Sequence, residues 1–146
     1  MMEFFVVTFA GIATVFDIKK RQIPNKLILC MFGTWVIILC VMLSIDVSRA
    51  AMLLIDSGLG LLIGGGIFMS VYFISKNGLG GGDVKFMAAA GLFLGLGSTL
   101  TSILFGSTLA AITGIVLIIF KKITRKDKMP LAPFLLIGIL TTVFLV

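Results

Sequence analysis

The chain has 146 residues, of which 60% are hydrophobic and only 12% are charged. Soluble domains usually carry about 25% charged residues, so the composition excludes an ordinary soluble protein and indicates a single all-α membrane-embedded domain over residues 1–146. The net charge of +6 does not indicate nucleic-acid binding, because the basic residues gather between apolar runs and therefore report on membrane topology.

Six apolar stretches follow one another along the chain, and we interpret each as a membrane-spanning helix. A helix needs about 20 apolar residues to cross a bilayer. The first and last stretches are at the short end of the usual range, and the fourth is shorter still. The predicted segments are residues 3–18, 27–45, 51–74, 83–95, 99–120 and 130–146.

The basic residues lie in alternate loops between these segments. Four lie within 19–26, Lys76 and Lys85 flank a glycine-rich stretch, and five lie within 121–128, which accounts for 11 of the 12 Lys and Arg residues. Only Arg49 lies in a loop on the other side. The positive-inside rule then places the three basic loops in the cytoplasm and both termini outside. A re-entrant fourth segment would move 121–128 to the outer face, so six crossings are the better count.

This topology brings two acids to the same membrane depth. Asp17 lies at the predicted cytoplasmic end of the first segment, and Asp83 lies at the cytoplasmic start of the fourth. Two carboxylates a few ångström apart cannot both ionise cheaply, so they share a proton. The ionised partner can then take a proton from water while the protonated one polarises a peptide carbonyl. The alternative interpretation is that each acid only balances the nearby lysines.

Four glycines lie within residues 78–82, directly before Asp83. Glycine has no Cβ, so another chain can approach its backbone closely. This favours an extended substrate lying against the glycine stretch beside a carboxylate. The residues expected to contact the substrate are Gly80, Gly81, Gly82 and Lys85.

Other kinds of catalytic site find little support in the sequence. The chain has no histidine, which excludes a Ser-His-Asp triad and most zinc-peptidase sites. Cys30 and Cys40 are expected to be packed thiols and neither a metal site nor a disulfide. No metal or cofactor is expected. Asp56 lies at the wrong depth to join the acidic pair, so we interpret it as a structural or interfacial acid.

Three motifs resemble those of the type IV prepilin peptidases. Gly80–Lys85 matches their G-x-G-D-x-K motif, Asp17 followed by residues 23–25 (Ile-Pro-Asn) resembles their first catalytic aspartate and its downstream motif, and residues 128–134 are similar to their late proline motif. The resemblance implies that Asp17 and Asp83 are the catalytic pair. It also implies a multi-pass protein of the cytoplasmic membrane that cleaves prepilin or pseudopilin leader peptides at the cytoplasmic face.

The chain also departs from the longer members of that family. Those members carry an N-terminal region, often with Cys-x-x-Cys motifs, and also methylate the new pilin N-terminus. This chain starts at the first catalytic helix, so N-methyltransferase activity and an S-adenosylmethionine site are not part of the expected function. The length is similar to that of the short peptidases of tight-adherence (Flp) pilus systems, and archaeal preflagellin peptidases are related.

Two other functions stay open on the sequence alone. One is an intramembrane G-x-G-D protease of the signal-peptide-peptidase or presenilin kind. The other is a small proton- or cation-coupled transporter that uses Asp17 and Asp83 as ion sites. Intramembrane proteases of the first kind are generally larger, and a transporter would need acids near the middle of the membrane.

Overall fold

The computed structural model describes residues 2–20, 22–75, 79–120 and 131–145. Within these ranges every regular element is an α-helix, which confirms the predicted all-α class. The basic cluster at 121–128 and the first residues of the proline motif lie outside the described residues. The helices are α1 (Met2–Lys20), α2 (Asn25–Ile45), α3 (Val47–Ile74), α4 (Gly81–Ile119) and α5 (Ala132–Leu145).

Local sequence explains where α2 and α3 begin. Pro24 has an extended backbone at the start of α2, and its carbonyl accepts a hydrogen bond from Leu27 N at 3.0 Å. Asp46 is the single residue between α2 and α3, and its Oδ1 accepts hydrogen bonds from Ser48 N at 2.9 Å and Arg49 N at 3.2 Å. A side-chain acceptor for otherwise unpaired N–H groups is the usual way to start a helix.

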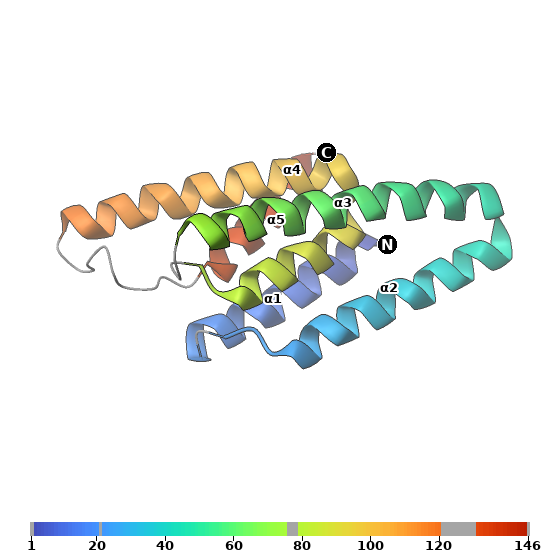
Figure 1. Ribbon diagram of the computed structural model, residues 1–146, viewed down its shortest axis with the longest axis horizontal. Helices are drawn as coiled ribbons and strands as arrows, with labels where there is room; N and C mark the ends of the chain where they lie inside the picture. The colour runs from blue at the N-terminus through green and yellow to red at the C-terminus, as the bar shows by residue number, and fades with distance from the viewer. Residues whose placement is uncertain (1, 21, 76–78, 121–130, 146) are drawn as a thin grey trace.

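The long helix α4 is broken at Gly95, whose backbone has φ 73° and ψ −177°. The chain folds back there, because Leu79 and Ser107 line the same cavity, whereas a straight helix would hold them about 40 Å apart at 1.5 Å per residue. Figure 1 shows the two legs of α4, the first yellow-green and the second orange, running in opposite directions. The predicted fourth and fifth segments are therefore these two legs, joined by a sharp break.

Three of the described helices, α2, α3 and α4, are long and apolar enough to cross a membrane, and Ala132–Phe144 forms a shorter apolar helix. This composition is that of a membrane protein. Met2 and Val143 line one cavity, and the two termini lie at the same end of the bundle (Figure 1). Chain ends on one side of a membrane require an even number of crossings. Six crossings with both termini outside stays a prediction.

Glycine contacts hold α3 against the first leg of α4. A Cβ on Gly60 would overlap the carbonyl oxygen of Gly91, and one on Gly64 would lie 2.6 Å from the carbonyl oxygen of Met87. Small residues at such positions let membrane helices approach until their backbones touch. This packing fixes the depth at which the first leg of α4, and so its first turn, lies in the bundle.

The prediction that Cys30 and Cys40 are packed thiols is wrong. Both side chains are free thiols exposed on the surface of the bundle, whereas α2 buries Leu27, Met31 and Trp35 on its other face. In a membrane protein the lipid-facing surface is as apolar as the core. An apolar sequence therefore does not reveal which face of α2 packs against the other helices.

Candidate active site

Asp17 belongs to the buried face of α1. The buried residues of this helix recur every three or four positions, at Val6, Ala10, Ala13 and Asp17 among others, which is the spacing of one helix face. Asp17 is only 5% exposed, so its carboxylate points into the bundle. Its Oδ2 atom accepts a hydrogen bond of 3.0 Å from the backbone N–H of Ala132, the first residue of α5.

Asp83 lies in the first turn of α4 and is 9% exposed. The helix start is formed by the backbone, since Asp83 N donates to the carbonyl oxygen of Gly80 at 3.0 Å. The carboxylate lies next to Gly80, whose backbone N–H interacts with it at the helix start. Its Oδ1 atom is buried and has no hydrogen-bond partner among the described residues. Buried polar atoms are nearly always paired, so an unpaired one indicates a place for water or a ligand.

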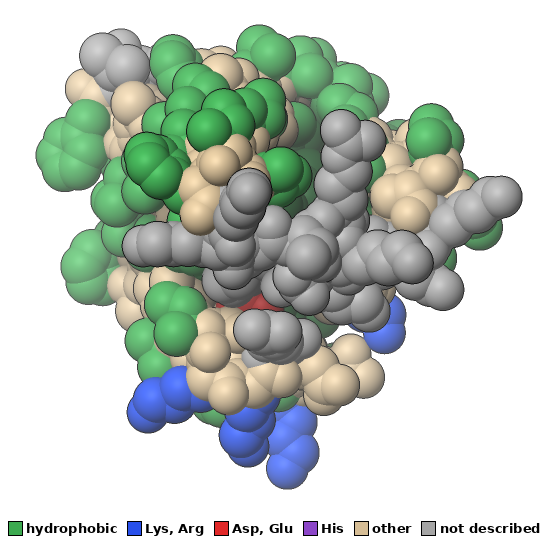
Figure 2. All heavy atoms as spheres, turned by 90° about the vertical axis from the view of Figure 1, so that its left-hand side faces the viewer, with side chains coloured by type: hydrophobic (Ala, Val, Ile, Leu, Met, Phe, Trp, Pro, Cys, Tyr) green, Lys and Arg blue, Asp and Glu red, His purple; other side chains and the backbone are tan. Residues whose placement is uncertain are grey.

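The two acids meet in one cleft of about 360 Å³, which we call the acidic cleft. They lie 66 residues apart in the sequence, yet they are close enough for their charges to interact. The end of α1 and the start of α4, which form the cleft, lie toward the left of Figure 1, and Figure 2 looks onto that end, where basic side chains gather along one edge. The cleft is lined by Asp17, Gln22, Ile23, Asn25, Gly80, Gly81, Gly82 and Asp83.

The three glycines of the cleft have different surroundings. A Cβ on Gly80 would lie 3.0 Å from Asp83 Oδ2, and one on Gly82 would lie 3.3 Å from the backbone and side chain of Ile23. Gly81 is exposed, and a Cβ there would meet nothing within 4 Å. Gly80 and Gly82 thus allow close packing around Asp83 and the Ile-Pro-Asn turn, while Gly81 leaves bare backbone at the cleft.

Comparison with known proteins connects this geometry to a family. Residues 4–115, which are more than half of the chain, match the model of the type IV leader peptidase family. The chain belongs to this family. No curated protein and no solved structure matches it. Both acids of this leader peptidase lie inside the matched residues, whereas α5 and its hydrogen bond to Asp17 lie outside them.

Lys85 does not line the acidic cleft of the leader peptidase. Its side chain is exposed, and Nζ donates a hydrogen bond of 3.3 Å to Asn25 Oδ1. Because Asn25 does line the cleft, the contact of Lys85 with the site among the described residues is through this amide. Asn25 and Gln22 were not among the predicted site residues. The Ile-Pro-Asn motif was the available signal for Asn25.

Asp56 lies away from the acidic pair, at the break in α4. Its Oδ1 accepts a hydrogen bond of 3.0 Å from Leu96 N, the start of the second leg, and a Cβ on Gly95 would overlap its Oδ2. Gly95 is 12 residues from Asp83, about 18 Å along a helix. Asp56 therefore caps a helix in the leader peptidase, which agrees with the structural role expected from its depth.

The described residues contain no group of three or more His, Cys, Asp or Glu side chains that could hold a metal ion. The acidic cleft offers two carboxylates, two amide side chains and exposed backbone. That set of groups suits the binding of a peptide and the transfer of protons.

Proposed function

We propose that this leader peptidase is an aspartic endopeptidase that removes the leader peptide of type IV prepilin or pseudopilin substrates. The observation that carries the proposal is the meeting of Asp17 and Asp83 in one cleft, in a chain of a family whose members cleave leader peptides. The bare backbone of Gly81 supports an extended substrate strand in the same cleft, since peptides are commonly held by backbone pairing.

The surroundings of the two acids support different roles for them. The N–H group of Ala132 stabilises the carboxylate form of Asp17, because a hydrogen bond to an ionised acceptor is stronger than one to a neutral acceptor. Asp83 interacts with the backbone N–H of Gly80, but its Oδ1 is buried with no hydrogen-bond partner among the described residues, and an unpaired buried charge is costly. We therefore assign Asp17 as the general base and Asp83 as the acid that holds the shared proton.

The reaction then follows from proton transfers between these groups. Asp17 takes a proton from a water molecule, and the water oxygen bonds to the scissile carbonyl carbon. Asp83 gives its proton to the carbonyl oxygen, which leaves a neutral tetrahedral intermediate. The C–N bond breaks as Asp17 passes its proton to the leaving nitrogen and Asp83 regains one from the collapsing diol. Water is consumed, and no acyl-enzyme forms.

We place the reaction at the cytoplasmic face of the cytoplasmic membrane. The exposed side chains of Lys19, Lys20, Lys26 and Lys85 lie on the elements around the cleft, and basic residues gather on the cytoplasmic side of membrane proteins. Such a location would let the enzyme meet the substrate leader before the pilin is exported.

The experiment is cleavage by the purified peptidase in lipid vesicles that also contain a type IV prepilin. Mass spectrometry should find the released leader and a mature pilin cut at one peptide bond. Proton flux across the same vesicles separates the enzyme from a transporter that would use the same acids. A protein that moves protons and leaves the prepilin intact would contradict the proposal.

A further inference from the structure

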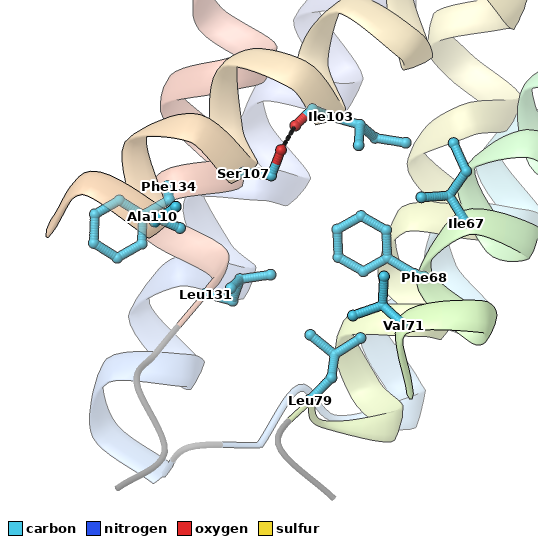
Figure 3. Close-up of a pocket in the computed structure, with 10 residues that line it drawn as sticks. Ile67, Phe68, Val71, Leu79, Ile103, Ser107, Ala110, Leu131 and Phe134 are labelled. Atoms are coloured by element: carbon cyan, nitrogen blue, oxygen red, sulfur yellow. Dashed lines mark hydrogen bonds between the residues drawn. The ribbon is translucent and has the colours of Figure 1, made fainter. Parts of the chain in front are cut away.

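A second cavity of about 410 Å³ lies beside the acidic cleft, and we call it the apolar pocket. Figure 3 shows it between α3, the second leg of α4 and the start of α5, with side chains from all three pointing inward. Its walls are almost entirely hydrocarbon. They include Phe68 and Val71 from α3, Ala110 from α4, and Leu79 and Leu131 from the segments that lead into α4 and α5.

The apolar pocket offers almost no polar group to a ligand. Ser107 is the one residue with a polar side chain among the described residues that line it. The hydroxyl of Ser107 already donates to the carbonyl oxygen of Ile103 within its own helix, at 2.5 Å (Figure 3). The pocket volume is within the range of roughly 300–1,000 Å³ that ligand pockets usually have, so an apolar occupant fits the site.

The apolar pocket and the acidic cleft meet at two peptide units. Leu79 lines the pocket, and its neighbour Gly80 lines the cleft. Leu131 lines the pocket, and the N–H of its neighbour Ala132 binds Asp17. The surface therefore changes from polar to apolar within one residue on each side, directly next to the two acids.

We propose that the apolar pocket is the subsite for an apolar segment of the substrate that lies next to the scissile bond. The inference rests on the proposed function and adds a requirement to it. When the scissile carbonyl of the substrate lies between the acids, the substrate residues that follow the scissile bond lie at the pocket. Burial of their apolar side chains there stabilises the complex. Val71, which lines the pocket, is 45% exposed, so a substrate anchored in the same bilayer can enter from the side.

The first test fills the pocket. Ala110→Phe and Ser107→Phe place a ring in it, and Leu104→Phe on the same leg is the matched control, because Leu104 is 66% exposed and does not line the pocket. The substrates are a full-length type IV prepilin and a short peptide of its leader that ends one residue after the scissile bond.

The filled variants should lose at least about tenfold in kcat/KM on the full-length prepilin and cut the short peptide as the wild type does. The control variant should match the wild type on both substrates. Unchanged cleavage of the full-length prepilin by both filled variants, or equal losses on both substrates, would overturn this inference alone. A wild-type enzyme that cuts neither substrate would overturn the proposed function and the inference with it.

The second test measures contact without relying on activity. Ser107→Cys and Leu104→Cys are made in an Asp83→Asn enzyme whose Cys30 and Cys40 are replaced by serine. The prepilin carries one cysteine in its apolar segment, and copper phenanthroline oxidises the two thiols to a disulfide. A cross-linked product should form with the cysteine at position 107 and not at position 104. If lipid occupies the pocket in place of substrate, no product will form at position 107, which overturns the inference.

Discussion

The backbone N–H of Ala132 donates a 3.0 Å hydrogen bond to the carboxylate of Asp17, which lies 115 residues earlier in the chain. The start of α5 therefore holds one of the two acids of the acidic cleft by a backbone hydrogen bond. It also lies beyond residue 115, where the match to the leader peptidase family ends. The last helix of the chain thus has a direct contact with the candidate catalytic pair.

Replacing either acid by its amide should abolish cleavage. In Asp17→Asn and Asp83→Asn the amide cannot take part in the proton transfers, so the rate should fall by at least about 10²-fold, as for the loss of a general acid or base. Cleavage of prepilin in vesicles measures the rate. Glu3→Gln is the matched control, because Glu3 is an exposed carboxylate on α1 outside the acidic cleft. Normal turnover by either asparagine variant would exclude the aspartic mechanism.

Removing the hydrogen bond at the start of α5 should reduce kcat. Ala132→Pro deletes the N–H donor at a position where helices accept proline, whereas the control Ala132→Gly keeps the donor. A hydrogen bond to a charged group contributes about 1.5–3 kcal/mol, so the rate of Ala132→Pro should fall by about 10- to 100-fold. Steady-state kinetics of the two variants measure this difference. Equal kcat values for both would show that the contact does not position Asp17.

The two packed glycines of the cleft should not accept a branched side chain. In Gly80→Val the new Cβ would lie against Asp83 Oδ2, and in Gly82→Val it would lie against Ile23. Cleavage should fall by about tenfold or more, which corresponds to about 1.4 kcal/mol in the transition state. Gly66→Val is the control, because a Cβ at Gly66 meets nothing within 4 Å. Rates are compared at equal membrane abundance, and wild-type rates for both variants would mean that the glycine stretch is only a connector.

The helix break at Gly95 should be sensitive to any side chain. Its φ of 73° with ψ of −177° belongs to a region open essentially to glycine alone, and other residues there cost about 1–3 kcal/mol. Gly95→Ala should therefore lower the Tm of the purified protein, and Gly97→Ala should not, since Gly97 has open space around it. Equal melting temperatures for both alanine variants would contradict this interpretation of the break.

Asp56→Asn should keep substantial activity, because its amide oxygen can still accept the Leu96 N–H.

Cysteine labelling from outside the cell tests the six predicted crossings. Single cysteines at residues 46–49 and 97–98 should react with a membrane-impermeant reagent in a chain that lacks Cys30 and Cys40. Cysteines at 19–26, 80–82 and 121–128 should react only after the membrane is opened. External labelling at residue 81 would refute the topology, because the acidic cleft would then face outward.

The sequence by itself determined the helical membrane class and the pairing of the two acids. Apolar runs near the length needed to cross a bilayer leave helices as the expected elements. The alternation of basic loops then places Asp17 and Asp83 at one depth, and the structure brings both into the acidic cleft. These features depend on composition along the chain, so they can be predicted without knowing how the helices pack.

Only the tertiary structure decided which face of each helix packs against the other helices and which face is exposed. Lipid and protein core are both apolar, so hydrophobicity did not distinguish the exposed thiol of Cys30 from the buried side chain of Met31 beside it. The hydrogen bond between Ala132 and Asp17 and the capping of Leu96 by Asp56 join residues 115 and 40 positions apart. Such contacts depend on the rotation and depth of each helix, and close backbone packing at glycines sets both.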